Sequence, residues 1–132
     1  MKLLVAAICD HAWEENGALT VCRTFDTVSA RAFPFVLPRI SIALRLLFRR
    51  AEAGQHKITI LLSDADGKTL MHSEVQVHMQ PPPSNTVSEA AFSFALNGQN
   101  VQFPAPGDYV VDIAVDGRVE ASIPLYVRQL EG

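Results

Sequence analysis

The chain has 132 residues, of which 48% are hydrophobic and 19% charged, and its formal net charge is −3. This length suits a single domain, residues 1–132, that can bury a core of its own. The apolar content argues against a disordered chain, and the acidic balance argues against a nucleic-acid partner, which calls for an excess of Lys and Arg.

The chain begins with a short apolar run, Leu3–Cys9, behind a single Lys2. Asp10 and His11 end this run without a small-residue cleavage site, so we expect a buried first strand, about Lys2–Cys9, rather than a signal peptide. No segment approaches the ~18 apolar residues of a membrane span. We therefore expect a cytoplasmic protein without a membrane partner.

Alternation of apolar and polar residues predicts about seven or eight strands. After the first strand, the expected extended segments are Ala18–Val28, Arg39–Phe48, His56–Ser63, Thr69–Met79, Glu89–Leu96, Tyr109–Val115 and Val119–Val127. The expected turns and connections are Glu15-Asn16-Gly17, Ser29–Pro38, Asp64–Gly67, Gln80–Ser84, Asn97-Gly98 and Asp116-Gly117. Short strands separated by such turns predict an all-β fold, an antiparallel β-sandwich of the immunoglobulin-like or C2-like kind.

Two segments support the prediction of a β-sandwich most strongly. Arg39–Phe48 contains good helix formers, but its apolar residues alternate strictly over ten positions, which favours a strand. Pro106-Gly-Asp-Tyr109 resembles the corner of immunoglobulin-like sandwiches, where a Tyr hydroxyl bonds back to nearby backbone.

The two cysteines, Cys9 and Cys22, are too few for a disulfide framework. They fall in predicted strands that can be neighbours, so one bridge is geometrically possible. Two reduced and buried thiols are the preferred interpretation, because free Cys is often buried.

Asp64-Ala-Asp66-Gly67 is similar to the start of a calcium-binding loop. Such a loop needs further oxygen ligands at its fifth and twelfth positions, which are here Lys68 and Val75. The pattern therefore fails, and the segment is interpreted as a hairpin turn.

Other potential ligands and catalytic groups are scattered. Their positions are Cys9, Asp10 and His11 at the end of the first strand, Glu14-Glu15 beside Trp13, and His72, Glu74, Gln76 and His78 on the polar face of Thr69–Met79. No Cys-x-x-Cys, His-Glu-x-x-His, Gly-rich phosphate loop or Gly-x-Ser-x-Gly motif is present. We therefore predict no catalytic, cofactor-binding or metal-binding residues and no enzyme activity.

Two groups of side chains point instead to interaction with a protein. The basic residues Arg39, Arg45 and Arg49 share the outer face of one predicted strand, with Arg50 next to it. The aromatic residues Trp13, Phe33 and Phe35 fall in predicted loops. Arg and aromatic residues are enriched in interfaces, although an ion-paired sheet face and plugs at the end of the core are the alternatives.

The whole pattern resembles a bacterial family of small proteins that is known only as a domain of unknown function. The resemblance is carried by Val5–Asp10, Gly17–Val28, Phe33-Pro-Phe35, Pro38–Leu46, Ala51–Ile58, Asp64–Gly67 and Pro106–Val127. It implies a one-domain β-sandwich, and it implies no activity and no site residue.

Two functional hypotheses follow. The first is a non-catalytic sandwich that binds another protein or a second copy of itself, as a component of a bacterial or phage-derived assembly. The second is a sandwich that binds a small ligand, a carbohydrate or calcium, through the acids near Asp64 or through Gln76, His72 and His78.

Overall fold

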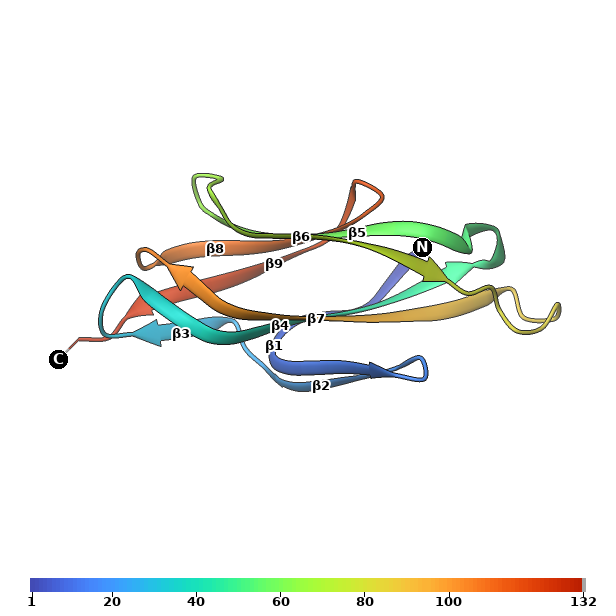
Figure 1. Ribbon diagram of the computed structural model, residues 1–132, viewed down its shortest axis with the longest axis horizontal. Helices are drawn as coiled ribbons and strands as arrows, with labels where there is room; N and C mark the ends of the chain where they lie inside the picture. The colour runs from blue at the N-terminus through green and yellow to red at the C-terminus, as the bar shows by residue number, and fades with distance from the viewer. Residues whose placement is uncertain (132) are drawn as a thin grey trace.

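Two β-sheets pack face to face in this protein (Figure 1). The structure is a computed structural model that describes residues 1–131. Within these residues the elements are β1 (Lys2–Glu15), β2 (Ala18–Thr24), β3 (Thr27–Ala30), β4 (Phe35–Arg49), the 3-10 helix η1 (Arg50–Glu52), β5 (Gly54–Asp64), β6 (Thr69–Met79), β7 (Glu89–Phe103), β8 (Gly107–Val115) and β9 (Arg118–Gln129). One sheet has the order β2-β1-β4-β7 and the other the order β3-β9-β8-β5-β6.

The all-β sandwich predicted from the sequence is confirmed, with corrections to several strands. The expected connection Ser29–Pro38 is shorter, because β3 includes Ser29 and Ala30 and β4 begins at Phe35. The described residues form nine strands rather than seven or eight. The expected segment Ala18–Val28 is two strands in different sheets, β2 and β3, and β3 pairs with β9 in parallel rather than antiparallel. The first strand does not end at Cys9, because β1 continues to Glu15 and pairs with β2.

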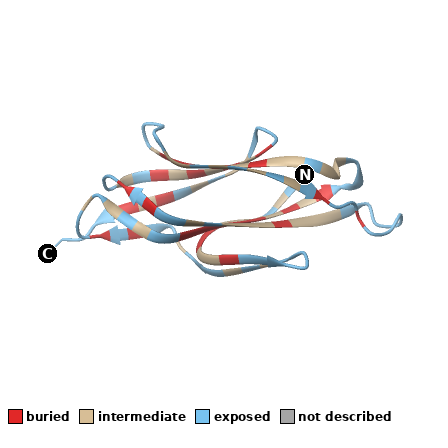
Figure 2. Ribbon diagram, viewed as in Figure 1, coloured by how far each residue is buried: buried red, intermediate tan, exposed pale blue. Residues whose placement is uncertain are grey.

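The core lies between the sheets and follows the period of two. On β4, the inward side chains of Ile40, Ile42, Leu44, Leu46 and Phe48 are at most 2% exposed. They face Val111, Ile113 and other inward residues of the second sheet in one cluster. In Figure 2 the buried segments accordingly fall within the paired strands, whereas the turns are exposed. The strand prediction for Arg39–Phe48 is therefore confirmed.

Two tight hairpins were predicted correctly. Asn16 and Gly17 join β1 to β2 with φ values of 51° and 84°, and Asp116 and Gly117 join β8 to β9 with φ values of 53° and 84°. Positive φ at both central residues is the geometry of a type I′ turn, whose twist matches that of paired strands.

The expected turn at Asn97-Gly98 is wrong, because both residues lie within β7 and pair with Ser41 and Ile40 of β4. A Cβ built on Gly98 would lie 3.3 Å from Met71 Sδ and 3.4 Å from Ile40 Cγ2. Gly98 is therefore explained by close packing of β6 and β4 against it, and not by a turn.

The predicted tyrosine corner is confirmed. The Tyr109 hydroxyl donates a hydrogen bond of 2.6 Å to the carbonyl of Ala105. The Tyr109 ring packs edge-on against Phe103, with ring centroids 5.0 Å apart. This contact fixes the chain where it crosses from β7 in one sheet to β8 in the other.

A third layer covers part of the first sheet. Beyond Cys9, β1 bends away from β4 and forms with β2 a hairpin, here called the β1–β2 hairpin (residues 9–24), which lies against the outer face of β4 and β7 (Figure 1). Small side chains on that face allow the approach, and Ala43 is completely buried together with Cys9 and Ala12. Asn97 Nδ2 donates to the Ala12 carbonyl at 3.2 Å and ties the hairpin to β7.

Candidate functional site at the free edge of β7

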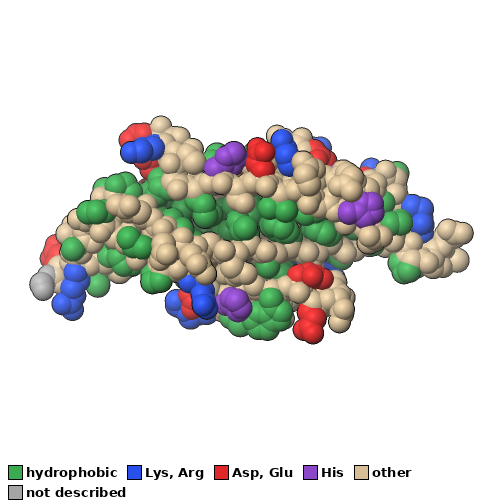
Figure 3. All heavy atoms as spheres, in the orientation of Figure 1, with side chains coloured by type: hydrophobic (Ala, Val, Ile, Leu, Met, Phe, Trp, Pro, Cys, Tyr) green, Lys and Arg blue, Asp and Glu red, His purple; other side chains and the backbone are tan. Residues whose placement is uncertain are grey.

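The sandwich is open on the side where β6 and β7 lie. In the described chain β7 pairs with β4 alone, and β6 pairs with β5 alone, so each strand is the edge of its sheet. Figure 3 shows hydrophobic side chains gathered in a band between the two sheets on this side. Apolar side chains of the core are thus accessible between two unpaired strand edges.

A groove of about 570 Å³ runs along the free edge of β7. Phe48, Phe92 and Phe94 line it from the core side, together with Val77 and His78 of β6. From the other side it is lined by Glu14 and Gly17 of the β1–β2 hairpin. The edge of β7 therefore lies between two walls, one from β6 and one from the hairpin.

The alternation of β7 gives the two sides of the groove different characters. Phe92 and Phe94 are paired with the inward residues Leu46 and Leu44 of β4, so they face the core. The residues between and beside them, Ala91, Ser93 and Ala95, face the hairpin side. The core side of the groove is therefore aromatic, and the hairpin side is lined by small residues.

Ser93 and Arg45 fix the hairpin tip beside this edge. Arg45 donates from Nη1 to the Gly17 carbonyl at 2.8 Å and to Ser93 Oγ at 2.6 Å. Ser93 Oγ donates to the same Gly17 carbonyl at 2.9 Å. The Gly17 carbonyl thus accepts hydrogen bonds from both side chains, which attaches the hairpin tip to β4 and β7.

The segment 90–96 of the β7 edge lacks the features that usually prevent pairing with another chain. Exposed edges are commonly protected by charged residues, Pro, bulges or short length. β7 has 15 residues, and its segment 90–96 contains neither a charged residue nor Pro. By contrast, β3 has only four residues, β2 carries the charged Arg23, and β6 carries Glu74 with exposed His residues.

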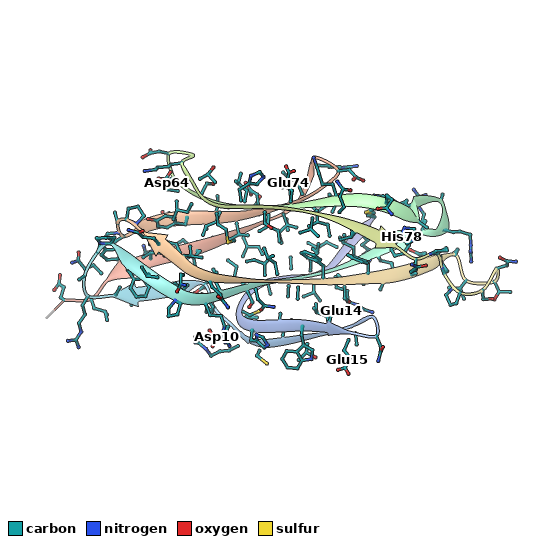
Figure 4. The ribbon with its side chains drawn as sticks, viewed as in Figure 1. Asp10, Glu14, Glu15, Asp64, Glu74 and His78 are labelled. Atoms are coloured by element: carbon teal, nitrogen blue, oxygen red, sulfur yellow. The ribbon has the colours of Figure 1, made fainter. Side chains whose placement is uncertain are left out.

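Polar groups mark both walls of the groove. Figure 4 shows His78 on one side of the β7 ribbon and Glu14 on the other, between β7 and the hairpin, with Glu15 on the far side of the hairpin. His78 Nδ1 lies 3.4 Å from Gln55 Nε2. Glu14 Oε1 accepts a hydrogen bond of 2.6 Å from the Gly17 N–H, and no partner of its second oxygen is found among the described residues.

The predicted Arg stripe is divided by the fold. Arg45 is partly buried under the β1–β2 hairpin, whereas Arg39 and Arg49 are exposed, and Arg49 Nε lies 3.5 Å from Glu52 Oε1. Arg50 donates to the carbonyls of Pro82 and Val87 at 3.2 and 3.0 Å and so holds the connection between β6 and β7. Arg45 and Arg50 thus form hydrogen bonds within the domain.

The loop aromatics also separate. Trp13 and Phe35 lie in strands, in β1 and β4, and not in loops as expected, while Phe33 lies in the connection before β4. Phe33 and Phe35 are partly buried and pack against the main core. Trp13 is 39% exposed, on the outer hairpin layer, and its ring centroid lies 5.3 Å from that of His11.

The candidate ligands are held in local contacts. Asp64 Oδ1 accepts hydrogen bonds from the Asp66 and Lys68 N–H groups at 2.9 and 2.8 Å, as in a turn. His72 Nε2 lies 3.5 Å from Glu74 Oε1 on the exposed face of β6. Over residues 1–131 no group of three or more His, Cys, Asp or Glu side chains is arranged to hold a metal ion.

The two thiols differ in environment. Cys9 is completely buried and Cys22 is exposed, so the expectation that both are buried is half wrong, and neither is in a disulfide. Burial raises the pKa of the Cys9 thiol, and the neighbouring Asp10 carboxylate adds to this shift. Asp10 itself forms an ion pair with Arg23, which lowers the Asp10 pKa.

A second polar hollow, of about 360 Å³, lies at the end of the sandwich near Met1, His56 and Asp116. Glu52 accepts hydrogen bonds of 2.9 Å from the Arg49 N–H and from the amino group of Met1, and these contacts lower the Glu52 pKa to about 2. The residues of this cluster are far apart in the sequence, and the sequence pattern did not group them.

The groove was also missed by the sequence analysis, since it depends on which strands are edges. The available signal was the run Ala90–Leu96, a long strand segment without charge or Pro.

No helix among the described residues is long and apolar enough to cross a membrane.

A protein-family model described as a family of unknown function (DUF6941) matches residues 4–128. The chain belongs to this family. The resemblance to a domain of unknown function is therefore confirmed over nearly the whole DUF6941 chain. A search of curated proteins found no match.

Two solved structures are similar to this DUF6941 protein. An immunoglobulin-like protein from Pseudomonas aeruginosa has 13% identity and a TM-score of 0.39, over 96% of this chain and 95% of that one. A glycosyl hydrolase family 2 member from Bacteroides cellulosilyticus DSM 14838 has 14% identity and a TM-score of 0.39. The match to the hydrolase covers 70% of this chain but only 14% of that one. With TM-scores below 0.5, neither neighbour assigns a function to the chain.

Proposed function

We propose that this DUF6941 protein is a non-catalytic interaction module that binds an extended segment of a partner protein along the free edge of β7. The observation that supports this proposal is the unprotected edge of β7 beside a groove with an apolar wall. An extended peptide that adds to a sheet edge gains main-chain hydrogen bonds, and its alternate side chains occupy pockets on the two faces.

The groove lies where a strand added to β7 would place its side chains. A strand added to β7 would lie about 4.8 Å from it, in the sheet's own hydrogen-bonding direction. Its alternate side chains would enter the space beside Phe92, Phe94 and Val77, where apolar surface is now accessible to water. Burial of apolar surface would then add to the backbone hydrogen bonds.

The test combines capture of the partner with mapping of its site. The protein is tagged in its host and recovered under mild salt, and amide hydrogen exchange of the purified complex locates the protected residues. We expect one stoichiometric partner and protection centred on residues 89–96.

Two matched variants test whether the edge itself is used. Ala91→Lys places a charge on the groove side of β7, and Thr20→Lys places the same charge on the exposed edge strand β2. We expect the first variant to lose the partner and the second to retain it, with both still folded by circular dichroism. Equal binding by both variants, protection elsewhere, or a self-association of the pure protein through β7 would overturn the proposal.

The ligand-binding alternative receives less support from the contacts. The Asp64 carboxylate is engaged in its own turn, and His72 and His78 lie on opposite ends of an exposed strand face. We therefore propose the protein-binding function alone.

A further inference from the structure

The hairpin wall of the groove carries an unmatched carboxylate at a defined position beside β7. Glu14 lines the groove opposite Ala91, Ser93 and Ala95. One of its oxygens accepts the Gly17 N–H, which keeps the carboxylate close to the hairpin tip. Its second oxygen has no partner among the described residues and can accept a hydrogen bond from a bound segment.

We propose that the segment accepted by β7 carries Lys or Arg at the position that faces Glu14, with an apolar residue on each side of it in the sequence. This inference rests on the proposed function and specifies the partner's chemistry. In a sheet, residues directly opposite each other on paired strands point to the same face. Partner residues opposite Phe92 and Phe94 would therefore enter the core side, and the intervening residue would face the hairpin.

The two sides select different side chains. The core side offers aromatic and aliphatic surface from Phe92, Phe94 and Val77, so apolar side chains fit there. The hairpin side offers the small residues Ala91 and Ser93, and a long side chain can extend over them toward Glu14. Lys and Arg have an apolar stem and a charged end that suit such a path.

The other charges beside the hairpin do not reverse this preference. Arg45 lies beneath the hairpin, where its Nη1 donates to the Gly17 carbonyl and to Ser93 Oγ. Glu15 follows Glu14 and lies on the far side of the hairpin (Figure 4). Among the residues that line the groove, the hairpin therefore contributes one acidic group, the Glu14 carboxylate.

Three synthetic peptides test this pattern by fluorescence anisotropy. The basic peptide is Thr-Val-Lys-Val-Lys-Val-Thr, the neutral peptide replaces each Lys by Thr, and the acidic peptide replaces each Lys by Glu. We expect the basic peptide to bind about two- to fivefold more tightly than the neutral one, as for a partly exposed ion pair. The acidic peptide should bind most weakly, and the difference should shrink in high salt.

Two protein variants assign the preference to one carboxylate. Glu14→Gln retains an oxygen for the Gly17 N–H but removes the charge, so the basic and neutral peptides should then bind alike. Glu15→Gln makes the same change on the far side of the hairpin and should leave the preference unchanged. Hydrogen exchange on each complex shows whether the peptide protects residues 89–96.

The outcomes separate the two proposals. If all three peptides protect β7 equally and with the same affinity, edge binding stands and the basic preference is wrong. If no peptide protects β7, edge binding by extended segments is itself wrong. If the preference persists in Glu14→Gln, another group is responsible, and the assignment to Glu14 is overturned.

Discussion

His56 of β5 contacts Asp116 in the turn between β8 and β9, with Nδ1 of the ring 2.6 Å from Oδ2 of the carboxylate. The other ring nitrogen, Nε2, lies 2.5 Å from the carbonyl of Glu52. Both neighbours are hydrogen-bond acceptors, so both contacts are satisfied only when each nitrogen carries a proton. The arrangement therefore favours the imidazolium form of His56.

The first prediction concerns the pH dependence of stability. Burial opposes the charge on His56, but the Asp116 carboxylate and the Glu52 carbonyl outweigh it, and the pKa of His56 is raised above 6.5. A raised folded-state pKa gives stability that is fully present below pH 6.5 and is lost as the pH rises through the folded value. We expect the wild-type protein to become less stable on this rise, as measured by urea unfolding.

Asp116→Asn tests the cause. Asn accepts the left-handed backbone at this position and can still accept the Lys57 N–H through Oδ1, but it removes the charged acceptor for His56. At pH 6 the variant should lose roughly 1–2 kcal/mol of unfolding free energy, less than for a buried hydrogen bond to a charged group because the Asp116 side chain is half exposed. The loss should be smaller at pH 9. A constant difference across this range would show that His56 does not titrate with Asp116.

A second prediction concerns the small residues beneath the β1–β2 hairpin. Ala43 is completely buried between β4 and this hairpin, against Cys9 and Ala12. Ala43→Leu adds three carbon atoms where the layers are in contact and should destabilise the fold by about 1–3 kcal/mol. Hydrogen exchange should increase in residues 9–24 before it increases in β8 and β9.

The matched control is Ala65→Leu, in the exposed turn between β5 and β6. It should leave the midpoint of urea unfolding nearly unchanged. If Ala43→Leu behaves like this control, the hairpin is not packed on β4 in solution as it is in the structure.

The sequence predicts strands correctly where buried and exposed residues alternate. It does not predict features that depend on the order of the strands in each sheet. The alternation of Ile40–Phe48 and of Tyr109–Val115 was visible because one face of each strand is apolar and lies in the core. The turn at Asp116-Gly117 was visible because it requires positive φ at both residues. These features are local, so neighbouring residues alone determine them.

The site was not visible for a physical reason. The segment Asp10–Glu15 is mostly polar, and it is a strand because small residues of β4 and β7 allow the β1–β2 hairpin to cover them. Ala43 and Ser93 look like solvent-facing residues in the sequence, yet the hairpin buries both. The groove exists because β6 and β7 are both edges, and strand order is a property of the whole chain.

A third prediction concerns Gly98, which resembles a turn residue in the sequence. Its place is in the middle of β7, and a Cβ there would contact Met71 Sδ and the Ile40 side chain at 3.3 and 3.4 Å. Gly98→Val favours the strand conformation but forces β6 and β7 apart, so we expect it to lower stability by about 1–3 kcal/mol. A variant as stable as the wild type would mean that Met71 moves away freely.

A paired substitution separates crowding from backbone effects. Met71→Ala removes the sulfur and costs stability by itself, because Met71 packs against the core. In the double variant, the additional cost of Gly98→Val should be smaller than in the wild-type background, as measured by a double-mutant cycle. Strictly additive costs would place the conflict with Ile40 rather than with Met71.

The fourth prediction concerns the corner between the sheets. Tyr109 is 5% exposed, and its hydroxyl donates to the Ala105 carbonyl at 2.6 Å. Burial raises the pKa of Tyr109. Tyr109→Phe keeps the ring against Phe103 but leaves the carbonyl without this donor, which should cost about 1–2 kcal/mol. The measurement is urea unfolding monitored by circular dichroism.

The control for this prediction is Tyr126→Phe. The Tyr126 ring stacks with Arg128 on β9, and no hydrogen bond of the Tyr126 hydroxyl is found in the described chain. The control variant should therefore lose no more than ~0.5 kcal/mol of unfolding free energy. Equal effects of the two variants would contradict a structural role for the Tyr109 hydroxyl. A larger loss in Tyr109→Phe, with the slope of the unfolding curve unchanged, would show that the corner stabilises the native sandwich without changing how much surface unfolding exposes.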